Sequence, residues 1–274
     1  MTVILLCLVS AASFGAMAVA IRFGLAGGSA PGAALAMLTW ATAIAIVAAL
    51  PQHDFHRSWQ FFLAGFLAPG CSQVLFTLSV REAGPSRTSV TVGAAPLVAV
   101  AIALVFLGEP VRTLLVLGAL AIVGGGVLLA AERDRPGHLR ARGLLFAAGA
   151  ATMFATRDNL VRAMHADASP QTAAAATLLA GTVAAALWTR RAPTRVELKR
   201  LAPAGVMFGL SYVLLFEAYW RGRVSVVSPL VATESLWGVG LAALLVRHTE
   251  GMGRRLALGA LLVVVGGAVI GATR

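Results

Sequence analysis

The stretch Leu107-Gly108-Glu109-Pro110 and the apolar run Gly118-Ala-Leu-Ala-Ile-Val-Gly-Gly-Gly that follows it decide the fold, because they recur later in the chain. The second copy lies 141 residues on (250 − 109), at Glu250 and Gly259-Ala-Leu-Leu-Val-Val-Val-Gly-Gly. Aligned without a gap, residues 109–131 and 250–272 are identical at 10 of 23 positions. Two copies of one sequence predict two copies of one structural unit.

The composition indicates a membrane protein. The chain has 274 residues, of which 59% are hydrophobic and 12% charged, whereas a soluble protein has about 25% charged residues. The mean hydropathy is +0.86. The net charge of +11 comes from arginines in short gaps between apolar runs, which is typical of membrane-protein loops. We therefore predict no nucleic-acid partner.

The apolar runs predict an all-α integral membrane protein. A helix that crosses the bilayer needs about 20 apolar residues, and short gaps rich in Gly, Pro and Ser separate the runs. No basic residue precedes the first run, which is also too long for a signal peptide, so we expect a retained helix. The ten predicted transmembrane helices cover residues 2–24, 31–50, 59–81, 86–107, 111–131, 142–164, 170–189, 200–220, 225–246 and 255–272.

The repeat extends over both halves of the chain. An offset of 140 aligns Phe14 with Phe154 and Ser29 with Ser169, and an offset of 141 aligns the later helices. A unit of five helices is odd, so the second copy enters the membrane from the opposite side. We predict two inverted five-helix repeats, residues 1–135 and 136–274, of the kind that supports alternating access.

At this point the sequence resembles the drug/metabolite transporter superfamily, EamA-type. The resemblance rests on the two five-helix repeats and on Gly108 and Glu109 before the glycine-rich fifth helix. Glu250 keeps the acid but follows Thr249, and Pro96 has Trp237 as its counterpart, which departs from the pattern. The resemblance implies a multi-pass secondary transporter of the cytoplasmic (inner) membrane, commonly an exporter of amino acids or related metabolites. It also implies a central cavity lined by helices 1, 3, 4, 6, 8 and 9.

Ionisable residues inside spanning helices are candidates for the functional site, because they are costly there. The sixth helix carries Arg157, Asp158 and Arg162, the eighth Glu217 and the ninth Glu234. Asp158 and Arg162 are four residues apart, so an ion pair within the helix is one interpretation. Arg157 has no acid on its own face. Its partner would be Glu217 or Glu234, or a substrate carboxylate held by its planar donors.

The carboxyl groups of Glu217, Glu234 and Asp158 are candidates for proton coupling, since burial favours the neutral form of an acid. The alternative is a structural ion pair with an arginine. Glu109 and Glu250, at helix ends, are interpreted as structural.

Further candidates for substrate binding are aromatic or polar residues at helical spacing. Helix packing and interfacial placement are the alternatives. These candidates are Tyr212 and Tyr219 on the eighth helix, Trp237 on the ninth, and Gln73 and Thr77 on the third.

Several functions are unsupported by any motif. Cys7 and Cys71 lie in apolar runs, where cysteine acts as a small apolar residue. No metal-binding, nucleotide-binding or catalytic pattern appears, so we predict no enzyme and no cofactor. We predict a secondary transporter that exports small metabolites, amino acids first, with the solute and the lipid bilayer as partners. The alternatives are an importer or uncoupled facilitator of the same fold, and a non-transporting scaffold or lipid-handling protein. The oligomeric state stays open.

Two arguments on orientation disagree. Of the basic residues near the gaps, 15 lie on the side opposite the termini and 6 on the termini side. Since basic residues collect in the cytoplasm, this count predicts termini outside the cytoplasm. The family resemblance suggests the reverse for typical members.

Overall fold

The structure, a computed structural model, is helical throughout the residues that it describes, which are 2–25, 28–95, 97–98, 102, 113–130, 141–164, 168–222, 227, 230–245 and 254–271. No strand occurs in these ranges. The α-helices are α1 (Val3–Gly24), α2 (Ala30–Ala49), α3 (Trp59–Gly65), α4 (Ser72–Ala83), α5 (Pro85–Val92), α7 (Thr113–Ala130), α8 (Ala141–Ala163), α9 (Pro170–Thr189), α10 (Arg195–Arg221), α12 (Glu234–Leu245) and α13 (Arg254–Gly271). Short helical segments η1 (Leu50–Gln52), η2 (Phe55–Arg57) and η3 (Phe66–Cys71) join α2, α3 and α4.

Each predicted run contains at least one helix. Five stretches are long and apolar enough to cross a membrane, so the chain is an all-helical membrane protein, while the count of ten crossings stays a prediction. Glu109, Glu250 and Pro96 lie outside the described residues. The five spanning stretches are Val3–Gly24, Ala30–Gln52, Trp59–Ala83, Pro170–Thr189 and Arg195–Arg221.

Local sequence explains where the helices begin. The side chains of Ser29 and Ser169 accept from the first turns of α2 and α9, and a proline follows each of them. Thr194 and Glu197 form a capping box at the start of α10. These side chains satisfy backbone N–H groups that a helix start leaves unpaired.

The third predicted helix, over residues 59–81, is broken, which the sequence analysis missed. Ala68 has non-helical angles (φ −143°, ψ 118°) just before Pro69, within η3. Proline lacks an N–H and cannot continue the helical ladder. The break fits closely against α9, where a Cβ added at Gly181 would lie 2.6 Å from Cγ of Pro69.

Helices α7 and α13 pack on each other through equivalent residues of the two copies. A Cβ at Gly125 would lie 2.7 Å from the carbonyl oxygen of Gly259, and one at Gly266 would lie 2.5 Å from that of Gly118. These contacts are reciprocal, since 118 + 141 = 259 and 125 + 141 = 266. Reciprocal contacts are the signature of a two-fold relation.

Two pairs of residues contact their own counterparts at an offset of 140. Hydroxyls of Thr42 and Thr182 are 2.7 Å apart, and the ring centroids of Phe14 and Phe154 are 5.9 Å apart. Equivalent residues touch only beside a two-fold axis. The pairs therefore agree with the predicted relation between the copies, whose boundary at 135/136 stays a prediction.

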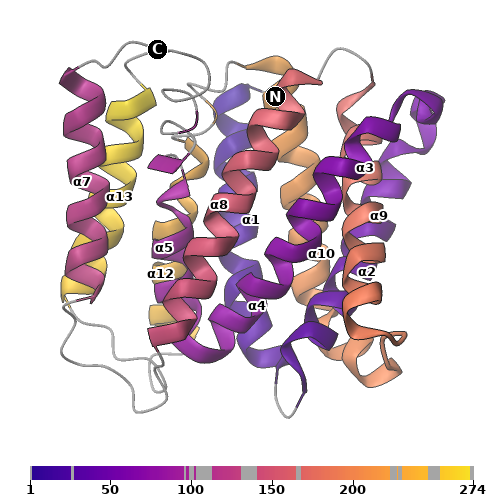
Figure 1. The fold of residues 1–274 in the computed structure, drawn as a ribbon, viewed down its shortest axis with the longest axis horizontal. Helices are drawn as coiled ribbons and strands as arrows, with labels where there is room; N and C mark the ends of the chain where they lie inside the picture. Colours follow the sequence, from indigo (N-terminus) through magenta and orange to yellow (C-terminus); the bar gives the residue numbers. More distant parts are fainter. Residues whose placement is uncertain are drawn as a thin grey trace.

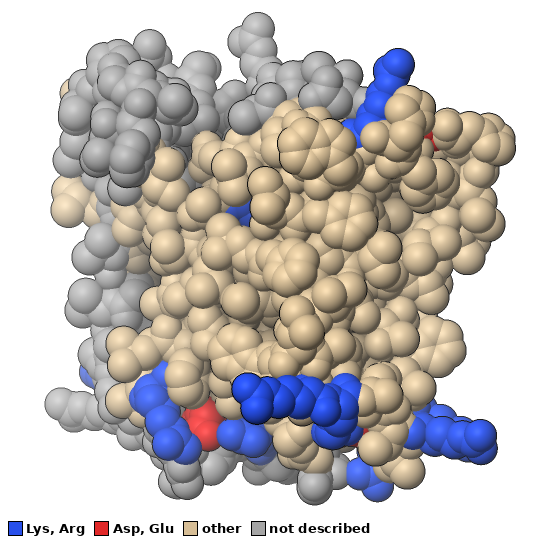
Figure 2. Space-filling view, turned by 45° about the vertical axis from the view of Figure 1, so that its right-hand side comes forward, with Lys and Arg blue, Asp and Glu red and all other residues tan. Residues whose placement is uncertain are grey.

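The helices form one bundle with α7 and α13 together at its side (Figure 1). Helix α1 begins and α13 ends at the same end of the bundle (Figure 1). Figure 2 shows lysine and arginine side chains gathered along the opposite end, below a largely uncharged belt. The core beneath this belt contains the region where α1, α8 and α10 meet.

Candidate functional site

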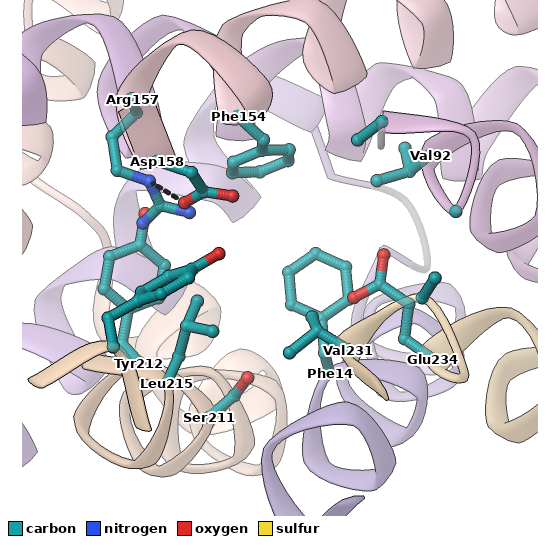
Figure 3. A pocket seen from close by; sticks show the side chains of 14 residues that line it. Phe14, Val92, Phe154, Arg157, Asp158, Ser211, Tyr212, Leu215, Val231 and Glu234 are labelled. Carbon is teal, nitrogen blue, oxygen red and sulfur yellow. Dashed lines mark ion pairs between the residues drawn. The ribbon is translucent and has the colours of Figure 1, made fainter. Parts of the chain in front are cut away.

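A cavity lies between α1, α5, α8, α10 and the chain that leads into α12 (Figure 3). It therefore draws residues from both copies of the repeat. The lining residues are Phe14, Val92, Gly93, Ala95, Phe154, Arg157, Asp158, Ser211, Tyr212, Leu215, Tyr219, Val231, Ala232 and Glu234.

Arg157 on α8 is the cation of the cavity, and its side chain is only 3% exposed. Its Nε lies 2.9 Å from Oδ1 of Asp158. The expectation that Arg157 pairs with Glu217 or Glu234 is wrong, because the guanidinium turns back to the next residue of its own helix. The side chain of Arg162, predicted to pair with Asp158, lies outside the described residues.

Arg157 and Asp158 neutralise each other's charge but leave several of their hydrogen-bonding atoms without a partner. Nε and Nη1 of Arg157 and Oδ1 of Asp158 have no hydrogen-bond partner in the described part of the chain, since the 2.9 Å contact is poorly aligned. Asp158 and Tyr219 both line this cavity. Buried polar atoms without partners are rare and call for a ligand or water. The cavity therefore retains hydrogen-bonding capacity on both ions.

Aromatic rings surround the guanidinium of Arg157. Its Cζ lies 4.7 Å from the ring centroid of Tyr212, 5.7 Å from that of Phe154 and 5.8 Å from that of Phe216. Tyr212 and Phe216 follow one another at i, i+4 on α10 and stack with centroids 5.6 Å apart. Such rings stabilise a cation whose water has been removed.

Glu234, the first residue of α12, lies across the cavity from Arg157 (Figure 3). It is 7% exposed and has no ion-pair partner within the described ranges. Its counterpart in the first copy is Gly93 (93 + 141 = 234), which lines the same cavity. The two copies thus differ in charge at one equivalent position of the cavity wall.

The structure brings together only some of the predicted site residues. Arg157, Asp158, Glu234, Tyr212 and Tyr219 line the cavity.

The remaining candidates lie elsewhere. Glu217 pairs with Arg221 and accepts a hydrogen bond of 2.9 Å from Gln171, which favours the structural-ion-pair interpretation. Trp237 is 44% exposed and lines an open apolar groove. Gln73 and Thr77 are fully buried, and the Thr77 hydroxyl bonds to the Gln73 carbonyl, as expected for helix packing.

Sequence reasoning missed the two phenylalanines and the small residues of the cavity wall. Phe14 and Phe154 carried a usable signal, since the repeat aligned them and an axis brings equivalent residues together. The sequence around Ser211 carried no signal of this kind. It pairs with Ser10 across α1 and α10 at 3.1 Å, a contact that depends on how the two helices are rotated.

No group of three or more His, Cys, Asp or Glu that could hold a metal occurs among the described residues. Cys7 and Cys71 are free thiols.

Spanning helices and a charged interior cavity define a multi-pass membrane protein of the transporter type. The chain belongs to the EamA-like transporter family, whose model matches twice, over residues 1–131 and 141–272. Among solved structures, one crystal structure is 21% identical, with a TM-score of 0.70 over 97% of this chain and 95% of that chain. That likeness shows the fold. No curated protein sequence matches the chain.

Proposed function

We propose that this protein is a secondary transporter that exports a small metabolite, an amino acid or a related compound, by alternating access. The observation that carries the proposal is Arg157, a guanidinium buried on a cavity between the two copies with unused hydrogen-bond donors. An ionisable group kept at this cost marks a solute path.

The cavity offers complementary groups for a zwitterion. Arg157 can hold a carboxylate through two parallel hydrogen bonds. The carboxyl of Glu234, on the opposite wall, can accept from an ammonium or carry a proton. The rings of Phe14, Phe154 and Tyr212 supply apolar surface of the kind that binds the rest of a small molecule.

The reciprocal contacts favour a rocking mechanism. Thr42–Thr182 and Phe14–Phe154 lie where a two-fold axis between inverted copies would run, and Phe14 and Phe154 also line the cavity. A movement of one copy relative to the other then opens the site to either side in turn. Residues 1–135 and 136–274 would be the moving units, in the inner membrane of the cell.

Flux of radiolabelled amino acids in proteoliposomes tests this function. We expect accumulation or release of at least one member of the panel, and a stronger flux with a pH gradient. The variant Arg157→Gln should reduce flux at least about a hundredfold, since a buried charge-assisted pair is worth roughly 3 kcal/mol or more. Arg221→Gln is the matched control, because Arg221 pairs with Glu217 outside the cavity. Equal losses in both variants would contradict the assignment of the site.

A further inference from the structure

We infer that Asp158 is an internal ligand, which occupies Arg157 in the empty cavity and is displaced when a solute carboxylate binds. The inference rests on the proposed function, since it describes how the same site exchanges its anion. It makes Asp158 a positioning residue for Arg157 in the empty state.

The contact between Arg157 and Asp158 is weak enough for another carboxylate to replace Asp158. Neighbouring residues of a helix point to different faces, so Asp158 reaches Arg157 from the side. The two ions lie 2.9 Å apart without hydrogen-bond alignment. Aligned, charge-assisted hydrogen bonds would make the pair much stronger. A solute carboxylate that approaches the planar donors therefore gains bonds that Asp158 does not make.

An exchange of anions on Arg157 requires that Asp158 be the more accessible of the two side chains, and it is. The Asp158 side chain is 21% exposed and the Arg157 side chain 3%. Arg157 is fixed by the rings of Tyr212, Phe154 and Phe216, whereas the Asp158 side chain borders the open space of the cavity (Figure 3). Asp158 is thus the member of the pair that can move.

Charge balance requires a proton in the exchange. The titratable groups that share the cavity with Asp158 are Arg157 on its own helix, Tyr212 and Tyr219 on α10, and Glu234 on α12, with Cys7 of α1 in one buried cluster with Tyr219. Arg157 is the one cation of this set. When a solute carboxylate takes Arg157, the Asp158 carboxylate is left without a counter-ion at low dielectric, which is costly. It then binds a proton from the aqueous phase and becomes a neutral carboxylic acid.

The test is rescue by an external anion, with sodium formate as the probe. In Asp158→Ala, Arg157 loses its internal ligand and a space for one carboxylate opens. We expect formate to raise the Tm of the purified full chain by about 3 °C in a saturable way, at constant ionic strength with chloride. Wild type should show this rise only as the pH is lowered, when Asp158 is protonated and releases Arg157.

Two controls separate this result from general ion effects. The double variant Arg157→Gln/Asp158→Ala should lose the formate response. Glu82→Gln, which also removes an ion-paired carboxylate but at a helix end outside the cavity, should not show the saturable rise.

Each outcome bears on the inference. A formate response absent from Asp158→Ala, or equal in the double variant, would overturn it. Asp158→Asn is the substitute if the alanine variant does not fold, and failure of both to fold in formate would also contradict it. Absence of flux in the wild type, by contrast, would overturn the proposed function while leaving the anion response as it is.

Discussion

At the scale of single residues, the neighbours of a carboxyl decide what it can do in this membrane. Glu217 is held by Arg221 and Gln171, so its charge is compensated whatever enters the cavity. Glu234 lines the cavity with no ion-pair partner in the described chain. A buried acid in that position is suited to bind and release a proton.

The variant Glu234→Gln should therefore weaken the response of solute flux to a pH gradient, because glutamine keeps the shape but cannot carry the proton, whereas Asp158 still can. The matched control is Glu217→Gln, which should keep the pH response and lose mainly stability. Proteoliposome flux with and without the gradient measures both. Proton coupling through Glu234 would be excluded if Glu234→Gln kept a wild-type pH response.

The sequence alone predicted five of the cavity residues because spanning helices rarely keep charge, and because Tyr212 and Tyr219 accompany the charges on α10. It could not separate these from Gln73, Thr77 and Trp237. Helical spacing alone does not reveal which face of α4 or α12 borders the cavity, because that depends on how each helix is rotated in the bundle. The partner of Arg157 was also unpredictable, since it depends on a side-chain rotamer.

At the scale of elements, an ion pair joins α4 of the first copy to α8 of the second. Nε and Nη2 of Arg142 donate to the two carboxylate oxygens of Glu82, at 3.0 Å each, and Arg81 lies 3.5 Å away. The backbones are close there, because a Cβ at Gly143 would lie 2.9 Å from Cβ atoms of Glu82 and Ala83. This pair therefore holds the two copies together at the basic end of the bundle.

We expect Glu82→Gln to lower the Tm in detergent, since two arginines lose their shared carboxylate. Arg142→Gln should lower it less, because Glu82 keeps Arg81 and the Arg142 side chain is 54% exposed, where water screens the charge. Thermal melting of the two variants beside wild type decides this. A lower Tm for Arg142→Gln than for Glu82→Gln would contradict the view that Glu82 serves both arginines.

Asp54, between η1 and η2, links the α2–α3 connection to the start of α9. The Ser169 backbone N–H donates to it at 2.6 Å, and the hydroxyls of Ser169 and Thr172 also donate. Partial burial acts to raise the pKa of the Asp54 carboxyl, but these hydrogen bonds outweigh it and hold the pKa below its ordinary value. The folded state thus favours the ionised form.

Because the folded pKa is lowered, ionised Asp54 stabilises the fold above its ordinary pKa and ceases to do so as the pH falls through the folded value. Asp54→Asn should cost about 1 kcal/mol at neutral pH, as for loss of a helix cap, with some reduction from solvent screening. The Tm difference from wild type should shrink as the medium is acidified. A Tm difference that grows on acidification would contradict a lowered pKa of Asp54 in the folded state.

At the scale of the whole molecule, the repeat was readable from sequence because both copies kept the residues of their mutual contact. Gly118, Gly125, Gly259 and Gly266 are needed where α7 and α13 approach each other, so they survive as a pattern. The break at Ala68 and Pro69 has no such echo in the second copy, where α10 is continuous. A break that occurs in only one copy gives no repeat signal. The continuous apolar run over residues 59–81 also predicts an unbroken helix there.

The distribution of charge over the molecule predicts its orientation. Basic side chains gather at the end opposite the start of α1 (Figure 2), and the connection from α9 to α10 alone contributes Arg190, Arg191, Arg195, Lys199 and Arg200. Since such residues are retained in the cytoplasm during insertion, we expect that end to be cytoplasmic and both termini to lie outside.

A fusion at Arg274 tests this orientation. Alkaline phosphatase, which is active outside the cytoplasm, should be active there, and green fluorescent protein, which is fluorescent inside it, should be dark. As an independent readout, Lys199→Cys in a chain with Cys7 and Cys71 replaced by alanine should resist a membrane-impermeant maleimide in intact cells and react after lysis. A fluorescent fusion together with labelling in intact cells would show that the typical family orientation prevails over the charge count, and that determinants near the first helix outweigh the basic α9–α10 connection.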